Sequence, residues 1–374
     1  MQFIDLQSQR ARLGTALEDA ILRVVRSGQY ILGPEVATLE RQLEAFCGAR
    51  HALTVANGTD ALALALMAFG VKAGDAVLVP SFTFAATGEV VVWFGATPIF
   101  VDCLPDTFNI DPASIEAGIA TAKRLGLRPI GVIPVDLFGL PADYDAIEAI
   151  CAANAMWILA DTAQGFGATY KGRRTGSIGR VAATSFFPAK PLGCYGDGGA
   201  IFFEDDALLE PLLSLRVHGQ GVDRYDNVRI GMNGRMDTIQ AAVLIEKLKI
   251  FPDEIAARNR IAERYSAALE KHVIVPRIPT GLTSVWAQYT IRVPDGRRDA
   301  VAAKLKEAGI PSAIYYVKPM HRQTAYSEYP VAANGLPVSD VLAGEVLSLP
   351  MHPYLSEADQ DRIASTVRAA LEAR

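Results

Sequence analysis

Short apolar segments alternate with amphipathic segments along most of the first two-thirds of the chain. Two early segments, Glu18 to about Arg26 and Glu35 to Phe46, have helical spacing, and a loop punctuated by Gly and Pro separates them. From His51 onward the pattern predicts strands at HALTVAN, AGDAVLVP, TPIFVD, RPIGVIPV and MWILAD. Helical stretches such as Asp143 to Asn154 separate these strands. Strands that alternate with helices predict an α/β fold with a mostly parallel sheet covered on both faces.

The pattern changes after two further strand-like segments, VAATSFF and GGAIFFED. Residues 236–270 are predicted to form long helices. The strand-like segment WAQYTIRV, the helix DAVAAKLKEAG and a closing helix from Glu357 follow. This order of elements indicates a smaller α+β domain at the C-terminal end. We therefore predict a large domain at residues 1–255, which includes an N-terminal helical segment, and a small domain at residues 256–374.

Composition narrows the possible functions. The net charge of −5 argues against a general affinity for nucleic acid. The N-terminal sequence lacks the apolar core of a signal peptide, and the most apolar stretches are short or broken by Gly and Pro. We therefore predict a cytoplasmic protein without a membrane span. The four cysteines show no CxxC spacing and no histidine at metal-ligand spacing, which predicts reduced thiols and no metal site.

Three segments that carry candidate chemistry follow predicted strands, where ligands bind in open parallel sheets. In the first, NGTDALALALMAFG, Gly58 permits a close backbone approach and Thr59 is predicted to cap the following helix. The Thr59 hydroxyl and the backbone amides of Thr59 and Asp60 would then form a cradle for a phosphate group. The alternative is an ordinary helix cap that binds no ligand.

The second segment, MWILADTAQGFGA, places Asp161 at the end of an apolar strand. A carboxylate in such a place needs a cation or strong hydrogen-bond donors. The protonated nitrogen of a pyridine-ring cofactor would be a suitable partner for Asp161. Gln164 would then reach an oxygen atom on the ring of that cofactor. The alternative is that Asp161 caps the next helix.

The third segment, SFFPAKPLGCYGDGGAIFF, places Lys190 in a turn between Pro188 and Pro191. A lysine amine that lies partly out of water has a lowered pKa, which suits covalent bonding to a carbonyl group. The alternative is a surface lysine in a turn. The glycines that follow form no dinucleotide-binding fingerprint because no helix follows them, and the chain has no P-loop motif.

Together and in order, NGTDAL, SFTFAAT, ADTAQGFGA, SFFPAKPLGCYGDGG and GMNGRMDTIQAA resemble the motifs of the DegT/DnrJ/StrS family of sugar-nucleotide aminotransferases. The resemblance extends from FIDL near the start to SLPMHPYL near the end. It implies the fold type I architecture of pyridoxal-phosphate-dependent transferases and a homodimer with shared active sites. Some relatives have a histidine in place of the cofactor-binding lysine and act as dehydratases, whereas this chain has Lys190.

The resemblance also implies a role for each residue of the cofactor site. Lys190 would bind pyridoxal phosphate covalently and shuttle the proton during amine transfer, and Asp161 would pair with the pyridine nitrogen. Gln164 would bond near the ring hydroxyl, and Phe84 would stack on the ring. The phosphate would be held by a group of four residues, which are Thr59, Asp60 through its backbone, Ser185, and Asn233 from the neighbouring subunit.

By the same resemblance, L-glutamate would load its amine onto the cofactor, giving pyridoxamine phosphate and 2-oxoglutarate, and the amine would then pass to a sugar ketone. GQYILGPEV, AQYTIRV and SLPMHPYL are most similar to enzymes acting on UDP-2-acetamido-2-deoxy-3-oxo-glucuronate, which make a 3-amino uronate for surface polysaccharides. One alternative is the same chemistry on another 3- or 4-keto-hexose or keto-6-deoxyhexose linked to dTDP, UDP or GDP. Another is a non-catalytic regulatory relative.

A uronate substrate carries a carboxylate, and a bidentate arginine is the expected partner for such a group. Arg235, two residues after Asn233, is predicted to fill that role by its motif position. The alternative for Arg235 is a structural salt bridge at a subunit interface.

Four further residues are predicted to contact the substrate. Tyr315 and Tyr316 would line the sugar pocket, although the family motif HYPxPxH has His and Pro where this chain has Tyr315 and Val317. His321 and Tyr30 are also predicted to face the substrate. The alternatives are a packed structural histidine for His321 and an interfacial tyrosine for Tyr30.

Overall fold

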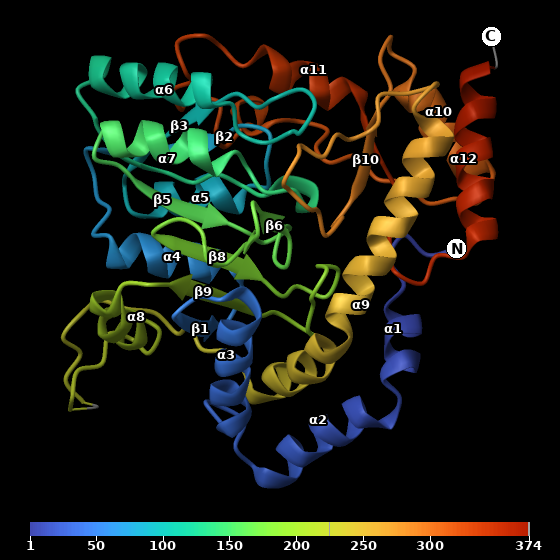
Figure 1. Ribbon diagram of the computed structural model, residues 1–374. Helices are drawn as coiled ribbons and strands as arrows, with labels where there is room; N and C mark the ends of the chain where they lie inside the picture. The colour runs from blue at the N-terminus through green and yellow to red at the C-terminus, as the bar shows by residue number, and fades with distance from the viewer. Residues whose placement is uncertain (224, 373–374) are drawn as a thin grey trace.

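A seven-stranded sheet lies at the centre of the larger part of the computed structural model, which describes residues 1–223 and 225–372 (Figure 1). The strands occur in the order β1 (His51–Val55), β9 (Gly199–Phe203), β8 (Val181–Ser185), β5 (Trp157–Asp161), β4 (Arg128–Val132), β2 (Asp75–Pro80) and β3 (Thr97–Val101). β9 runs antiparallel to both of its neighbours, and the other adjacent pairs are parallel. The predicted mostly parallel sheet is therefore confirmed.

Helices cover both faces of this sheet, because the side chains of each strand alternate between the faces. On one face, apolar residues of the strands pack against α4 (Gly58–Ala68), α5 (Ala86–Trp93) and α8 (Leu209–Leu215). On the other face, the alternate residues pack against α3 (Pro34–Cys47), α6 (Pro112–Arg124), α7 (Tyr144–Ala153) and the first half of α9 (Thr238–Leu269). Burial on both faces explains why the strands are continuous apolar runs in the sequence.

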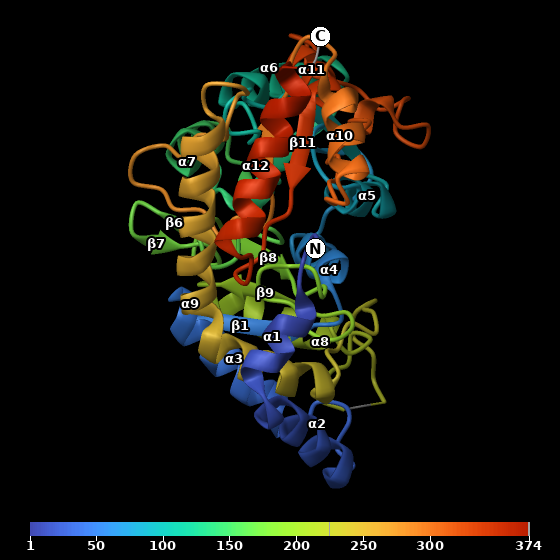
Figure 2. The same ribbon diagram turned by 90° about the vertical axis from the view of Figure 1, so that its right-hand side faces the viewer.

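The C-terminal part of the chain has an apolar core of its own. β10 (Tyr289–Arg292) pairs antiparallel with β11 (Val346–Leu349). α10 (Arg298–Glu307), α12 (Glu357–Glu372) and the second half of α9 contribute to the same core (Figure 2). α11 (Pro337–Glu345) belongs to a smaller apolar cluster that also contains Phe82 and Val135 from the end of the sheet.

Shorter elements complete the chain. α1 (Leu6–Leu13) and α2 (Thr15–Ser27) come first, and α2 packs against the start of α9. β6 (Thr169–Tyr170) and β7 (Arg173–Arg174) form a small antiparallel pair. Three single turns of 3₁₀ helix are η1 (Leu137–Gly139), η2 (Asp206–Leu208) and η3 (Met320–Arg322).

α9 is one continuous helix of 32 residues, where the sequence predicted several helices (Figure 1). Pro252 lies inside it, although proline removes one helical hydrogen bond, because apolar packing on both sides of that position holds the helix in place. Phe251 belongs to the core of the sheet, whereas Ile261 belongs to the C-terminal core. The predicted domain boundary between residues 255 and 256 falls inside this helix and stays a prediction.

Membrane-spanning helices and clustered metal ligands are both absent from the described part of the chain. None of its helices combines the length and the apolar character that crossing a lipid bilayer requires. Within the same residues, no group of three or more His, Cys, Asp or Glu side chains is arranged to hold a metal ion. All four cysteines are buried and free.

Candidate active site

The candidate residues gather at one edge of the sheet, where the parallel strands have their carboxyl ends. β1 and β8 both pair with β9 so that Val55 and Ser185 lie opposite the same residue, Gly199. β5 is parallel to β8, with Asp161 opposite Ala183. The loops that follow these strands therefore meet at one edge, which is where open α/β sheets bind ligands.

The loop after β1 and the end of β8 touch each other at Gly58. A Cβ atom added to Gly58 would lie 2.7 Å from the Cβ atom of Ser185 and 3.2 Å from its Cα atom, so only glycine fits. Thr59 and Asp60 form the next two residues of the first turn of α4, whose amide groups point toward the helix N-terminus. The structure thus brings Thr59, Asp60 and Ser185 together at a helix N-terminus, which favours a phosphate group.

The predicted helix cap at Thr59 is wrong by two positions. Asn57 caps α4, because its side-chain oxygen accepts a hydrogen bond from the Asp60 amide at 2.8 Å. Asn and Thr both cap helices well, and the extended backbone of Asn57 decides between them. Thr59 lies inside the first turn of the helix, which leaves its hydroxyl free of the capping role.

Lys190 lies in the loop between β8 and β9. Its backbone amide donates to the carbonyl oxygen of Phe187 at 2.8 Å, and its side chain is half-buried. Burial lowers the pKa of Lys190, and the neighbouring Asp161 carboxylate opposes that shift. The half-buried position argues against the alternative of a solvated surface lysine.

Asp161 is the last residue of β5 and is only 6% exposed. One carboxylate oxygen accepts from the hydroxyl of Thr87 at 3.0 Å, and the other accepts from the amide of Ala163 at 3.1 Å. Burial raises the pKa of Asp161, whereas these two donors and Lys190 act in the opposite direction. No helix follows Asp161 among the residues that are described next to it, so the alternative of a helix cap is wrong.

Gln164 is held from two sides. Its side-chain oxygen accepts from the amide of Phe138 at 2.8 Å, and its side-chain nitrogen donates to the hydroxyl of Tyr316 at 3.2 Å. Tyr316 also contacts Phe82 and Tyr315 edge-on, with ring centroids 5.9 Å apart in each case. The structure therefore places Tyr315 and Tyr316 beside the predicted cofactor site, and their contact with substrate stays a prediction.

Phe84 lies between the end of β2 and the start of α5, and it is 60% exposed. The carbonyl oxygen of Phe84 accepts from the amide of Thr87, the same residue that bonds Asp161. An aromatic ring that is this exposed beside the carboxyl edge is available to stack on a flat ligand.

Three residues predicted to bind the phosphate or the substrate, Asn233, Arg235 and Tyr30, lie in other segments and differ in exposure and in hydrogen bonding. Asn233 is exposed, and the carbonyl oxygen of the next residue, Gly234, accepts a hydrogen bond from the amide of Ala56 at 2.9 Å. Arg235 is half-buried, and its buried Nε atom has no hydrogen-bond partner within the described residues. Tyr30 is half exposed and its hydroxyl donates to the carbonyl oxygen of Val25.

His321 is bound at both ring nitrogens. Nδ1 lies 2.7 Å from the hydroxyl of Ser81, and Nε2 lies 3.1 Å from a carboxylate oxygen of Asp340. Burial lowers the pKa of His321, and Asp340 opposes the shift. These contacts agree with the structural alternative for His321, and its contact with substrate remains untested.

Sequence reasoning missed two residues behind the predicted cofactor site. Thr87 binds Asp161 from α5, in the same SFTFAAT motif as Phe84. Asp136 is fully buried, one of its oxygens accepts from the hydroxyl of Tyr144 at 2.8 Å, and its backbone amide donates to the carbonyl oxygen of Asp161. Burial raises the pKa of Asp136 to about 7. The available signal was an acid after the apolar run RPIGVIPV, the same pattern that identified Asp161.

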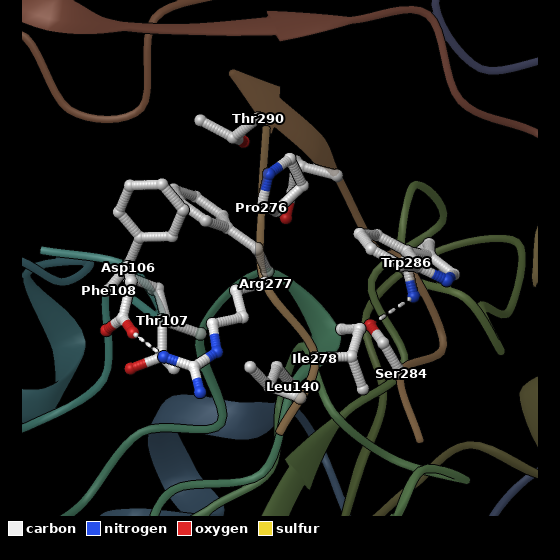
Figure 3. Close-up of a pocket in the computed structure, with 13 residues that line it drawn as sticks. Asp106, Thr107, Phe108, Leu140, Pro276, Arg277, Ile278, Ser284, Trp286 and Thr290 are labelled. Carbon is white, nitrogen blue, oxygen red and sulfur yellow. Dashed lines mark hydrogen bonds and ion pairs between the residues drawn. The ribbon is translucent and has the colours of Figure 1, made fainter. Parts of the chain in front are cut away.

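A separate small pocket lies between the loops that follow β3 and β4 and residues 276–290 of the C-terminal part (Figure 3). Phe108, Phe138 and Trp286 line it, and all three have positive φ angles, which side chains larger than glycine rarely adopt. The amide of Phe138 is the one that holds Gln164, so the wall of this pocket also supports the cofactor site. Its lining also includes Asp106 and Arg277, which form an ion pair with 3.2 Å between the charged atoms (Figure 3).

The residues present at the carboxyl edge fit pyridoxal phosphate. Gly58 leaves a cradle that a Cβ atom would fill, and Thr59 and Ser185 supply hydroxyl groups beside a helix N-terminus. Asp161 is a buried acid with an oriented carboxylate, and Lys190 is an amine with a lowered pKa. This combination is typical of pyridoxal-phosphate-dependent enzymes of this fold, aminotransferases among them.

The chain belongs to the DegT/DnrJ/EryC1/StrS aminotransferase family, whose model matches residues 12–368. It is 47% identical over 359 residues to the UDP-2-acetamido-2-deoxy-3-oxo-D-glucuronate aminotransferase of Pseudomonas aeruginosa, covering 96% of this chain and 97% of that one. A crystal structure of a family member from Brucella abortus is similar over 100% of both chains, with a TM-score of 0.98 and 54% identity. The structure of NtdA from Bacillus subtilis with bound cofactor PMP matches 99% of this chain and 83% of its own, with a TM-score of 0.88 and 26% identity.

These findings confirm three predictions. The fold is the fold type I α/β class, the cofactor is pyridoxal phosphate, and the activity is that of an aminotransferase. The assignment of individual residues to the cofactor and the substrate stays a prediction.

Proposed function

We propose that this chain transfers an amino group from L-glutamate to the 3-keto carbon of UDP-2-acetamido-2-deoxy-3-oxo-glucuronate, giving a 3-amino uronate for surface polysaccharides. The similarity to the Pseudomonas aeruginosa enzyme over nearly the whole of both chains supports this substrate. The observation that carries the chemistry is the half-buried Lys190 beside the buried Asp161 at the carboxyl edge of the sheet.

Pyridoxal phosphate supplies an aldehyde that exchanges amines and a ring that takes up the electron pair released from a broken C–H bond. Lys190 holds the cofactor through Nζ and, once released, moves the proton at the reacting carbon. Its lowered pKa leaves a larger neutral fraction of the amine near pH 7, which both tasks require. Asp161 keeps a proton on the ring nitrogen, and Thr87 and Ala163 fix the direction of its carboxylate.

The phosphate-binding group anchors the other end of the cofactor. Thr59 and Ser185 would bind the phosphate next to Gly58, where the backbone approaches most closely. The Asp60 amide would join them by exchanging its hydrogen bond to the Asn57 side chain for one to the phosphate. Phe84 covers one face of the ring, and Gln164, oriented by Phe138 and Tyr316, bonds beside the ring hydroxyl. Holding both ends fixes the reacting carbon relative to the Lys190 amine.

Arg235 binds the carboxylate of the uronate in this proposal. Its Nε atom is buried without a partner in the described part of the chain, and an unpaired buried guanidinium nitrogen gains from an anionic ligand. The carbonyl oxygen of the neighbouring Gly234 accepts a hydrogen bond from the amide of Ala56 in the same chain.

The first experiment tests the cofactor chemistry. Borohydride treatment of the native holoenzyme should leave a pyridoxyl group on Lys190, identified by peptide mass spectrometry, and Lys190→Ala should lose both half-reactions. A pyridoxyl group on another residue, or full turnover by Lys190→Ala, would refute the assignment of Lys190.

The second experiment tests the sugar. Amine transfer from labelled L-glutamate is measured with a panel of keto-sugar nucleotides, with and without the uronate carboxylate. We expect kcat/KM for the 3-oxo-uronate to exceed that of the matching neutral sugar by about tenfold or more, the value of one charge-assisted bond. Equal values would remove the uronate preference.

The second candidate function is the same chemistry on another keto-hexose nucleotide. Tyr315 is half-buried against Tyr316 and Phe3, at a position where the family motif has His. A tyrosine there is larger and stays neutral near pH 7, which changes the shape and charge that the sugar meets. The panel of substrates distinguishes the two candidates directly.

The proposal includes a homodimer that completes each active site with Asn233 of the other subunit. The support is the set of large apolar side chains that a single chain exposes in two segments, namely Tyr30, Ile31, Leu32, Val222, Val228 and Ile230. A mixture of equal amounts of Lys190→Ala and Asn233→Ala subunits should recover about a quarter of the wild-type activity, because half of the dimers are mixed and each has one intact site. No recovery after subunit exchange would place Asn233 in its own subunit's site or outside the sites.

We also propose that the enzyme works in the cytoplasm. The four buried cysteines are free rather than paired, as expected for a protein in a reducing compartment.

A further inference from the structure

A second buried lysine, Lys247, lies beneath the loop that carries Lys190. It belongs to α9 and is fully buried, with 0% of its surface exposed. Its Nζ atom donates to the carbonyl oxygen of Gly193 at 2.6 Å and lies 4.2 Å from the centre of the Tyr195 ring. A buried ammonium is costly unless it meets strong acceptors or an aromatic face, and both of these partners come from the same loop.

Gly193 in turn abuts the backbone that holds Lys190. A Cβ atom on Gly193 would lie 2.6 Å from the carbonyl oxygen of Phe187 and 2.5 Å from that of Pro188. The same Phe187 oxygen accepts the hydrogen bond from the Lys190 amide at 2.8 Å. A displacement of Gly193 therefore passes directly to the turn that carries Lys190, because the two backbone segments are in contact.

A second residue of α9 holds the loop two positions further on. The side-chain oxygen of Gln240 accepts from the amide of Tyr195 at 2.8 Å, and its nitrogen donates to the carbonyl of Tyr195 at 3.3 Å. Lys190 itself has no hydrogen bond or ion pair to its Nζ atom within the described residues. Its reactive amine is thus free, while α9 fixes the backbone around it.

We propose that Lys247 is a positioning residue for Lys190, holding the loop through Gly193 so that the Lys190 amine meets the cofactor aldehyde in the reactive geometry. This inference rests on the proposed role of Lys190 and concerns the formation of the covalent bond rather than the binding of the cofactor. Within the described residues, Lys247 contacts Gly193 and Tyr195 rather than Gly58 or Asp161, so we expect cofactor binding without the covalent bond to be independent of Lys247.

The lowered pKa of Lys247, about 8, agrees with its burial, which Cys194 and Glu254 only partly offset. Even so, the carbonyl of Gly193 and the face of Tyr195 both favour the charged form of the amine. Replacing the side chain by one of similar length without a donor removes these contacts and leaves the helix packing in place.

The experiment compares Lys247→Met with wild type and with Lys249→Met, a control on the same helix whose lysine is exposed and pairs with the buried carboxylate of Glu246. Apo protein is mixed with pyridoxal phosphate, samples are quenched with borohydride over time, and the pyridoxyl group on Lys190 is quantified by mass spectrometry. Affinity for pyridoxamine phosphate, which cannot form the covalent bond, is measured in parallel by fluorescence titration.

We expect Lys247→Met to slow the labelling of Lys190 by about 10- to 100-fold, the size of effect that a misplacement of about 1 Å produces. Its affinity for pyridoxamine phosphate should stay within about twofold of wild type, and Lys249→Met should match wild type in both measurements. Lys247→Gln, which keeps an N–H donor on a shorter side chain, should lie between wild type and Lys247→Met.

Two results would overturn the inference. One is unchanged labelling in Lys247→Met, and the other is an equal loss of covalent and non-covalent binding, which indicates general damage to the site. Should Lys247→Met fail to fold, Gln240→Ala tests the same loop, with the same split between labelling and pyridoxamine phosphate affinity expected. Absence of the pyridoxyl label on Lys190 in the wild-type protein would contradict the proposed function itself. That outcome is therefore distinguishable from a failure of the inference about Lys247.

Discussion

Replacing Gly58 by alanine tests the phosphate cradle directly. The added Cβ atom would lie 2.7 Å from the Cβ atom of Ser185, whereas ordinary contact begins at 3.4 Å. The start of α4 or the end of β8 must therefore move by about 0.7 Å, the difference between these two distances. Because both segments belong to a packed core, the displacement separates the two sides of the cradle.

Overpacking of this kind costs about 1–3 kcal/mol. Expressed entirely in cofactor affinity, that range corresponds to a loss of roughly 5- to 150-fold. Expressed in the apo protein instead, it lowers the free energy of unfolding by the same amount. The loss of cofactor affinity and the loss of unfolding free energy, measured together, should therefore account for the full cost of the added Cβ atom.

The assay is a titration of apo protein with pyridoxamine phosphate, followed by urea unfolding of the apo form. Gly344→Ala is the matched control, because Gly344 is exposed in α11 and a Cβ atom there has nothing within 4 Å. The control should bind normally and gain about 0.5–1 kcal/mol of stability, since alanine favours a helix over glycine. Wild-type affinity together with wild-type stability in Gly58→Ala would refute the reasoning about the cradle.

Three further predictions concern the acid, the sugar and pH. Asp161→Asn should reduce the rate of amine transfer by at least about 100-fold, measured in single turnover, with folding unchanged by circular dichroism. Arg235→Lys should raise KM for a 3-oxo-uronate nucleotide about tenfold and leave that for a neutral keto-sugar unchanged, because lysine cannot bind a carboxylate in a bidentate manner. Burial lowers the pKa of His352 to about 4, so the folded state binds fewer protons than the unfolded state between about pH 6.5 and 4. The free energy of unfolding of wild-type apo protein should therefore fall across that window by up to about 3 kcal/mol more than that of His352→Gln, as measured by urea unfolding at several pH values; equal slopes would show that His352 does not titrate as a buried neutral group.

The sequence predicted the strands and most helices because their packing follows simple rules. Each strand of the sheet is buried on both faces, which makes it a continuous apolar run, and the intervening helices keep a helical period. The rule that ligands bind at the carboxyl ends of strands then selected Asp161 and Lys190 before any contact was known.

The remaining features depend on contacts between distant segments. Thr87 binds Asp161 across 74 residues of sequence, and the bond that Lys247 makes to Gly193 spans 54. No local pattern separates a buried lysine in IEKLKIF from an exposed one, and here Lys247 is buried while Lys249 is not. The cap at Asn57 escaped prediction for a different reason. Asn57 and Thr59 both belong to residue types that cap helices, and the backbone angles that distinguish them are not visible in the sequence.

The pairing of β1 with β9 has a consequence for synthesis of the chain. His51 lies opposite Phe203, so β1 has no partner on that side until 152 further residues (203 − 51) have been made. At about 5–20 residues per second, the ribosome needs roughly 8–30 s to supply them. During that interval an apolar strand has an unpaired edge, which favours aggregation of the nascent chain. Pairing over such a long sequence separation also slows folding.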